Sequence, residues 1–158
     1  MNAKVSGTDA PDEVCALLTG VAVNLPHLHP DGRPVADATT STDYSMTIPV
    51  RSPADDVAAP STLQRWLWYA ARRAGLHLDA IEDDYSTLAR RVAAVRKIAP
   101  VLRVSSSDLE GLLPHVSVTR FGSEEVMQKG GDVPSGMSFV VNGRVRLASP
   151  ARMARSSR

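Results

Sequence analysis

Apolar residues recur at helical spacing near the start of the chain. The predicted helix carries on one face Val14, Leu17, Leu18, Val21 and Leu25. The stretch Asp9-Ala10-Pro11-Asp12-Glu13 marks its start, with Asp9 as the cap, a proline near the first helical position and acids where the helix dipole favours them. Pro26 and the Pro30-Asp31-Gly32 turn end this helix.

Two short strands are predicted next. Residues 35–38 form the first, and residues 44–50 alternate between apolar and polar side chains as a half-buried strand does. The apolar face of the second strand would present Tyr44, Met46, Ile48 and Val50.

A second helix is predicted from about Thr62 to Ala74. Ser61-Thr62-Leu63-Gln64 has the pattern of a capping box, and Gly75 suits a left-handed cap at the other end. Leu76-His77-Leu78 then resembles a short strand. Helix, strand, strand, helix and short strand predict an α+β fold, a small ferredoxin-like segment over residues 9–80.

The second half begins after an acidic joint at residues 79–84. A helix is predicted there with apolar positions Leu88, Val92, Val95 and Leu102 and basic positions Arg90, Arg91, Arg96 and Lys97. Ser107-Asp108-Leu109-Glu110 is a second capping box, which opens a short helix closed by Pro114. Residues 149–158 are compositionally loose and predict a disordered tail.

Short apolar or alternating runs from Arg120 to Leu147 are separated by glycines, at which the backbone is expected to turn: Gly122, Gly130, Gly131, Gly136 and Gly143. Gly130-Gly131-Asp132 is expected to be such a turn. This pattern predicts a small, partial antiparallel β-barrel. Asn142-Gly143 lies between residues 137–141 and 144–147, and Asn-Gly is the pair that tolerates positive φ at both central positions of a type I′ hairpin turn.

Composition narrows the classes of function. The chain has 158 residues, 43% of them hydrophobic and 22% charged, and a formal net charge of +1, which gives no strong attraction to nucleic acid. Cys15 is the single cysteine, and no secretory signal opens the chain, so a reducing, cytoplasmic setting is expected. The longest apolar stretch, Val14 to Leu25, has 12 residues, fewer than the roughly 20 that span a bilayer.

The glycine-punctuated stretch resembles the first half of a cyclic nucleotide-binding domain. The resemblance covers about residues 85–148 and is carried by Phe121, Gly122, Val126, Gly131, Asp132, Met137, Phe139, Val140, Val141, Gly143 and Val145. In that family a later Gly-Glu turn, a short helix and an Arg hold the phosphate of the ligand. Nothing after Leu147 matches this cassette, so the resemblance implies a truncated domain that does not bind cyclic nucleotide itself.

The first half resembles the end of the cytosolic α/β domain of small-conductance mechanosensitive channels. The matching features are the strand ending in Ile48-Pro49-Val50 and the helix that ends in Ala70-Ala71-Arg72-Arg73-Ala74-Gly75-Leu76. The two resemblances together imply a non-enzymatic regulatory fragment of a cyclic nucleotide-regulated mechanosensitive channel, involved in ion transport. A free-standing module that acts through protein contacts is the alternative.

The side chains that could carry chemistry are expected to have ordinary structural roles. His27-x-His29-x-Asp31 lacks a fourth metal ligand nearby and is expected to be a solvated loop, and Cys15 is expected to act as a small hydrophobe. Arginine pairs at residues 72–73 and 90–91 are expected to pair with nearby acids rather than with nucleic acid. No metal, cofactor or catalytic residue is predicted.

Three aromatic residues form the candidate interface. Trp66, Trp68 and Tyr69 project from more than one face of the second predicted helix, so they cannot all enter one small core. Ordinary packing with one half-exposed ring is one interpretation. A subunit or domain contact is the other, and it predicts a homo-oligomer or association with a larger channel polypeptide.

Overall fold

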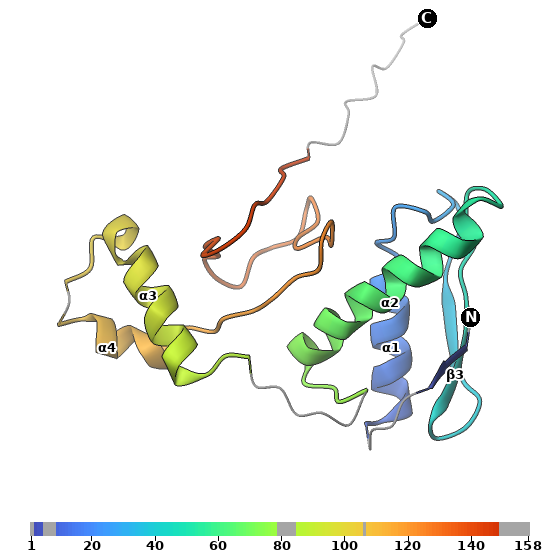
Figure 1. Cartoon of the computed structure of the whole chain (residues 1–158), viewed down its shortest axis with the longest axis horizontal. Helices are drawn as coiled ribbons and strands as arrows, with labels where there is room; N and C mark the ends of the chain where they lie inside the picture. Colours follow the sequence, from blue (N-terminus) through green and yellow to red (C-terminus); the bar gives the residue numbers. More distant parts are fainter. Residues whose placement is uncertain (1, 5–8, 79–84, 106, 149–158) are drawn as a thin grey trace, which may run out of the picture. The chain divides into compact units, whose positions relative to one another are not determined.

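A computed structural model describes residues 2–4, 9–78, 85–105 and 107–148 (Figure 1). The chain forms two compact units. The first unit contains residues up to Ser86 together with Thr119–Glu125, and the second contains Thr87–Val118 together with the described residues from Val126 onward. The predicted acidic joint at 79–84 and the predicted tail at 149–158 lie outside the described residues.

The first unit contains a three-stranded antiparallel sheet. Its strands are β1 (Asn2–Lys4), β2 (Val35–Ala38) and β3 (Asp43–Thr47), in the spatial order β1-β3-β2. Tyr44 of β3 lies opposite Ala3 of β1 on one side and Ala38 of β2 on the other. The helix α1 (Pro11–Ala22) connects β1 to β2, which flank β3, and this is a split β-α-β arrangement. The α+β prediction is therefore confirmed, with an open sheet.

Helices α1 and α2 (Asp55–Ala74) pack against each other and supply most of the core (Figure 1). Tyr44 and Met46 of β3 are buried and Thr47 is exposed, which confirms the predicted alternation. The core cluster consists of Val14, Leu18, Val21, Ala22, Leu25, Tyr44, Met46, Leu63, Trp66, Leu67 and Ala70.

The start of α1 corrects one prediction. Ala10, not Asp9, is the N-cap, and no side chain caps the helix. The carboxylate of Asp9 instead accepts a hydrogen bond from the backbone N–H of His77 at 2.9 Å. Leu76-His77-Leu78, predicted as a strand, is not assigned to one. Asp9 thus ties the chain after α2 to the chain before α1.

Helix α2 begins earlier than predicted. It starts at Asp55, so Ser61 lies inside the helix and forms no capping box. Asp55 and Asp56 occupy the first turn, where the helix dipole favours acids, and Pro60 lies inside the helix. Gly75 closes the helix at a φ of 73°, as predicted.

The second unit contains α3 (Leu88–Leu102), α4 (Leu109–Leu112) and a 3-10 turn, η1 (Leu113–His115). Ala94 and Val95 of α3 are buried, and the side chain of Thr87 caps this helix. Arg91 donates a hydrogen bond to the carbonyl oxygen of Leu113 at 3.1 Å and so links α3 to η1.

Two sequence expectations for the second unit are wrong. Leu88, placed by the sequence on the apolar face, is largely exposed. Asp108 is the N-cap of α4 without a side-chain cap bond, so the capping box led by Ser107 does not form. The hydroxyl of Ser107 lies 2.7 Å from that of Ser105 instead.

The predicted barrel strands and hairpin are also not present in the described residues 116–148, none of which is assigned to a strand. A type I′ turn needs positive φ at both central residues. Gly143 has a φ of 91°, but Asn142 is not among the described residues with positive φ. A hairpin without further strands is marginal in water, and no strand pair in the described residues supports this one.

The glycine turn at residues 129–132 does form. Gly131 has a φ of 95°, and the carboxylate of Asp132 accepts the N–H of Lys129 at 2.8 Å while Asp132 N–H donates to the carbonyl of Lys129 at 3.2 Å. The prediction that Gly-Gly-Asp is a turn is confirmed. Among the described residues no helix is long and apolar enough to cross a membrane.

Tyr44→Phe is expected to stabilise the protein. The Tyr44 hydroxyl is buried and has no hydrogen-bond partner in the described part of the chain, and burial raises the pKa of this group. An unsatisfied buried polar group costs about 1–3 kcal/mol, so its removal should raise the free energy of unfolding by about 1 kcal/mol in urea titrations. Tyr44→Leu is the control, which should lower the same quantity because it removes the packed ring.

Candidate interaction site on helix α2

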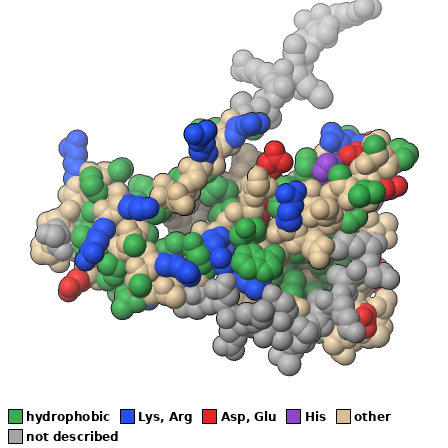
Figure 2. Space-filling view, viewed as in Figure 1, with side chains coloured by type: hydrophobic (Ala, Val, Ile, Leu, Met, Phe, Trp, Pro, Cys, Tyr) green, Lys and Arg blue, Asp and Glu red, His purple; other side chains and the backbone are tan. Residues whose placement is uncertain are grey.

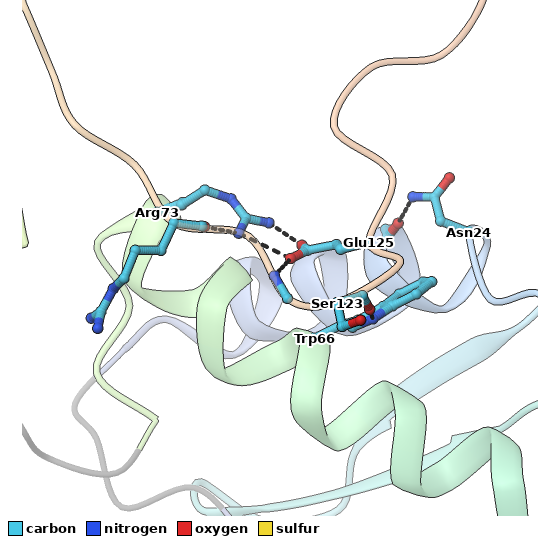
Figure 3. Close-up of polar contacts among 8 residues, drawn as sticks. Asn24, Trp66, Arg73, Ser123 and Glu125 are labelled. Atoms are coloured by element: carbon cyan, nitrogen blue, oxygen red, sulfur yellow. Dashed lines mark hydrogen bonds and ion pairs between the residues drawn. The ribbon is translucent and has the colours of Figure 1, made fainter. Parts of the chain in front are cut away.

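Residues 119–125, here called the docked segment, lie against the C-terminal half of α2 (Figure 3). The ring of Trp66 is 1% exposed within the core. Its Nε1–H donates a hydrogen bond to the carbonyl oxygen of Ser123 at 2.9 Å. One side chain therefore serves both the core and the docked segment.

An ion pair forms the second connection. The guanidinium of Arg73 pairs with the carboxylate of Glu125, with Nη1 3.3 Å from Oε2, and the side chain of Glu125 is only 6% exposed. Nη1 of Arg73 also donates to the carbonyl oxygen of Arg120 at 2.6 Å. Arg73 lies in the last turn of α2, where the helix dipole favours a cation. A partly buried, multiply hydrogen-bonded pair is stronger than a typical surface salt bridge.

Close packing at Gly122 forms the third connection. A Cβ at this position would lie 3.1 Å from Cδ1 of Trp66 and 3.1 Å from Cδ2 of Tyr69. The N–H of Gly122 donates to Oε2 of Glu125 at 2.7 Å. The guanidinium of Arg73 stacks 4.1 Å above the ring of Phe121. Glycine is therefore the residue that fits between the two aromatic rings.

The three aromatic candidates occupy three different environments. Trp66 is in the core, Tyr69 is half-buried beside Gly122, and Trp68 is 39% exposed. Trp68 contacts Tyr69 edge-on, with ring centroids 4.8 Å apart. The guanidinium carbon of Arg72 lies over the ring of Trp68, 3.9 Å from its centroid. The structure brings all three to the docked segment, because Trp66 and Tyr69 flank Gly122 and the guanidinium of Arg120 lies 4.8 Å from the ring centroid of Trp68.

The four turn positions of the cyclic nucleotide-binding resemblance, Gly122, Gly131, Asp132 and Gly143, are divided between the two units. Gly122 belongs to the docked segment and the first unit. Gly131, Asp132 and Gly143 belong to the second unit. Gly122 is therefore the one of these positions that contributes to the site on α2.

The histidine loop forms a different site from the one considered in the sequence. Nδ1 of His27 lies 2.9 Å from Oδ1 of Asp55, and the hydroxyl of Ser52 donates to Oδ2 of the same carboxylate at 2.9 Å. His29 accepts the backbone N–H of Asp31 at 3.2 Å. The described residues contain no group of three or more side chains that could hold a metal ion.

Ser52, His27 and Asp55 have a structural arrangement that differs from that of a nucleophilic catalytic triad. A catalytic relay places the hydroxyl on the imidazole and the imidazole on the carboxylate. Here both Ser52 and His27 bind the carboxylate of Asp55, so the hydroxyl faces no base. Cys15 is a free, partly buried thiol on α1 packed against the core, as a small hydrophobe would be.

Sequence reasoning missed the pairs that define the site on α2. Arg73 was expected to pair with acids near it in the sequence, whereas Glu125 lies 52 residues away. The Trp66 to Ser123 bond ends on a backbone carbonyl, which no sequence pattern marks. Within the docked segment only Phe121 and Gly122, which carry the cyclic nucleotide-binding resemblance, were named from the sequence.

Comparison with known proteins identifies no family. No protein-family model, curated protein or solved structure matches the chain. The two family resemblances thus stay predictions.

Gly122→Ala is expected to release the docked segment. Its Cβ would meet two aromatic rings, and Trp66 is fixed in the core, so overpacking should cost about 1–3 kcal/mol. The chain has 2 Trp, so its NMR spectrum contains few indole N–H signals, and the signal of Trp66 should exchange with solvent at least tenfold faster.

Gly130→Ala is the matched control for this change. A Cβ at Gly130 would meet nothing within 4 Å, so the Trp66 indole should keep its protection. Equal protection in both variants would contradict the packing described for Gly122.

Asp55→Asn is expected to make the free energy of unfolding less dependent on pH in acid. Hydrogen bonds from His27 and Ser52 hold the pKa of Asp55 below its ordinary value of 3.8. The unfolded chain then takes up this proton first, so the stabilisation is present above about pH 3.8 and is lost as the pH falls through the lowered pKa. The variant should be less stable than the wild type at neutral pH and should converge with it in acid.

Urea titrations between about pH 3 and about pH 7 test this expectation. Asp56→Asn is the matched control for removing one charge from the same helix end, because the Asp56 side chain is exposed. Parallel pH curves for the wild type and Asp55→Asn would show that the His27 and Ser52 contacts do not stabilise the folded state.

Proposed function

We propose that this chain is a non-enzymatic regulatory module, similar to the cytoplasmic tail of a cyclic nucleotide-regulated mechanosensitive channel. The docked segment is the element that transmits regulation. The observation that supports this proposal most is that residues 119–125 belong to the first unit while the residues on both sides belong to the second. A change in the second unit therefore reaches α2 through the covalent chain.

The contacts of the docked segment suit a switch between two states. An Arg73 to Glu125 pair, a Trp66 to Ser123 hydrogen bond and the fit of Gly122 hold a short piece of chain that contains no regular secondary structure. Such a segment can leave α2 without disrupting the core formed by α1, α2 and β3. A partner that binds the released state would shift the equilibrium by its difference in affinity for the two states.

The proposal includes no binding of cyclic nucleotide by these residues alone. A selective site offers the phosphate backbone N–H groups and an arginine held in place. Arg144 and Arg146 are exposed on a stretch without helix or strand, so they provide charge without fixed geometry. The partner we propose is a larger channel polypeptide in the cytoplasm.

A second candidate function is a free-standing module that binds another protein through residues 126–147. Apolar side chains are highly exposed along this stretch, including Val133 at 92%, Met137 at 82% and Leu147 at 95%. Exposed apolar side chains at this density are typical of interaction surfaces. Figure 2 shows hydrophobic side chains interspersed with Lys and Arg on one face of the molecule.

Val95→Ala tests the regulatory function. Val95 is buried in the second unit, and its truncation should destabilise that unit by about 2 kcal/mol. A looser second unit lengthens the tether of the docked segment and lowers its effective concentration at α2. The Trp66 indole should then exchange several-fold faster, although Val95 lies outside the first unit.

Val133→Ala is the matched control, since it makes the same truncation at an exposed position of the second unit and should leave the Trp66 signal unchanged. Addition of cyclic AMP to the wild type should produce neither a saturable heat in calorimetry nor a change at Trp66. An unchanged Trp66 signal in Val95→Ala would refute transmission through the docked segment.

A further inference from the structure

The α2 surface formed by Trp66, Tyr69 and Arg73 holds the docked segment of the same chain. We propose that this surface is a peptide-binding site, and that it takes residues 121–125 from a second copy of the chain in exchange for its own. The inference rests on the docked segment as the regulatory element of the proposed function. It adds that the partner is a second copy of the chain.

The recognised features lie within five consecutive residues. Phe121 stacks under Arg73, Gly122 fits between Trp66 and Tyr69, Ser123 presents its carbonyl oxygen to Trp66, and Glu125 pairs with Arg73. Ser123 is recognised through its backbone, and Glu124 is exposed. The surface therefore selects an acidic peptide of the pattern Phe-Gly-x-x-Glu.

The peptide also organises itself. Glu125 N–H donates to the carbonyl oxygen of Gly122 at 3.2 Å, and Gly122 N–H donates to Oε2 of Glu125 at 2.7 Å. These two bonds close the turn within the segment. A segment whose bound shape is supported by its own hydrogen bonds loses less entropy on binding, whether it comes from the same chain or from another.

Each copy of the chain carries both the surface and the peptide. Exchange between two copies preserves every contact and makes a symmetric dimer in which each interface is the same. The described residues on both sides of the docked segment, 116–118 and 126–148, are assigned to no helix or strand that would have to be broken.

The docked segment of the same chain competes with the segment of a second copy, and it is favoured because it is tethered to the α2 surface. A short flexible tether gives an effective concentration in the millimolar range, so the chain at micromolar concentration keeps its own segment in place. Exchange becomes dominant when the internal contact is disabled and the external one is kept. Two charge-reversed variants create this condition.

The experiment mixes Arg73→Glu with Glu125→Arg. Each variant alone places like charges at the ion pair, within the chain and between identical copies, so each should be monomeric with an unprotected Trp66 indole. In the mixture both exchanged pairs join opposite charges. Light scattering should show a heterodimer at micromolar concentration, and the Trp66 indole signals of both copies should regain protection.

Two further variants control for folding and for the peptide fit. Arg73→Glu combined with Glu125→Arg in one chain restores opposite charges internally and should be a monomer with a protected indole. Gly122→Ala added to both partners should weaken the heterodimer at least tenfold, because its Cβ blocks the fit against Trp66 and Tyr69. A synthetic peptide of residues 119–126 should restore indole protection in Glu125→Arg, whose α2 surface is intact.

The outcomes separate the inference from the function on which it rests. A mixture that stays monomeric, or a heterodimer that tolerates Gly122→Ala, would overturn exchange between copies while leaving the regulatory proposal standing. Protected indoles in both single variants would show that the ion pair does not hold the segment, and both proposals would fail.

Discussion

The indole of Trp66 faces two environments, and the first unit depends on both. Its ring fills the core between α1, α2 and β3, where it is 1% exposed, while Nε1–H reaches the surface and meets the carbonyl of Ser123. A buried Trp needs a partner for its N–H, and this one finds it on a segment 57 residues later. The core thus fixes the position of the site, because movement of the ring would disturb the packing of Leu63 and Leu67 around it.

The length of α2 explains why the site can exist on so small a unit. Its 20 residues place core side chains in the middle and Arg73 at the C-terminal end. There the guanidinium gains from the helix dipole, from the carbonyl of Arg120 and from Glu125 at once. Both partners are only partly exposed, so salt screens this pair less than it screens the pairs on open helix faces. The helix dipole and the carboxylate of Glu125 therefore both favour a positive charge on Arg73.

Local patterns in the sequence were sufficient to predict much of the first unit. The face of α1, the strands around Ala36 and Tyr44 and the left-handed Gly75 follow from periodicity and backbone chemistry within a few residues. The start of α2 was misplaced because Ser61-Thr62-Leu63-Gln64 has the pattern of a capping box, whereas the acids of the first turn support an earlier start. The barrel was wrong because alternation indicates a strand only where partner strands exist, and residues 137–147 have none in the described chain. The site itself joins residues about 50 positions apart, beyond the range of any local pattern.

The backbone at Glu124 opposes docking of the segment. Its φ of 63° lies in the left-handed region, which a residue with a Cβ adopts at a cost of roughly 1–2 kcal/mol. The conformation persists because both neighbours are held, Ser123 by Trp66 and Glu125 by Arg73. A glycine would have removed this strain, and glycine is used two positions earlier, at Gly122, where contact with the rings requires it. The strain opposes the favourable contacts, so it brings the docked and released states closer in free energy, as a regulatory contact requires.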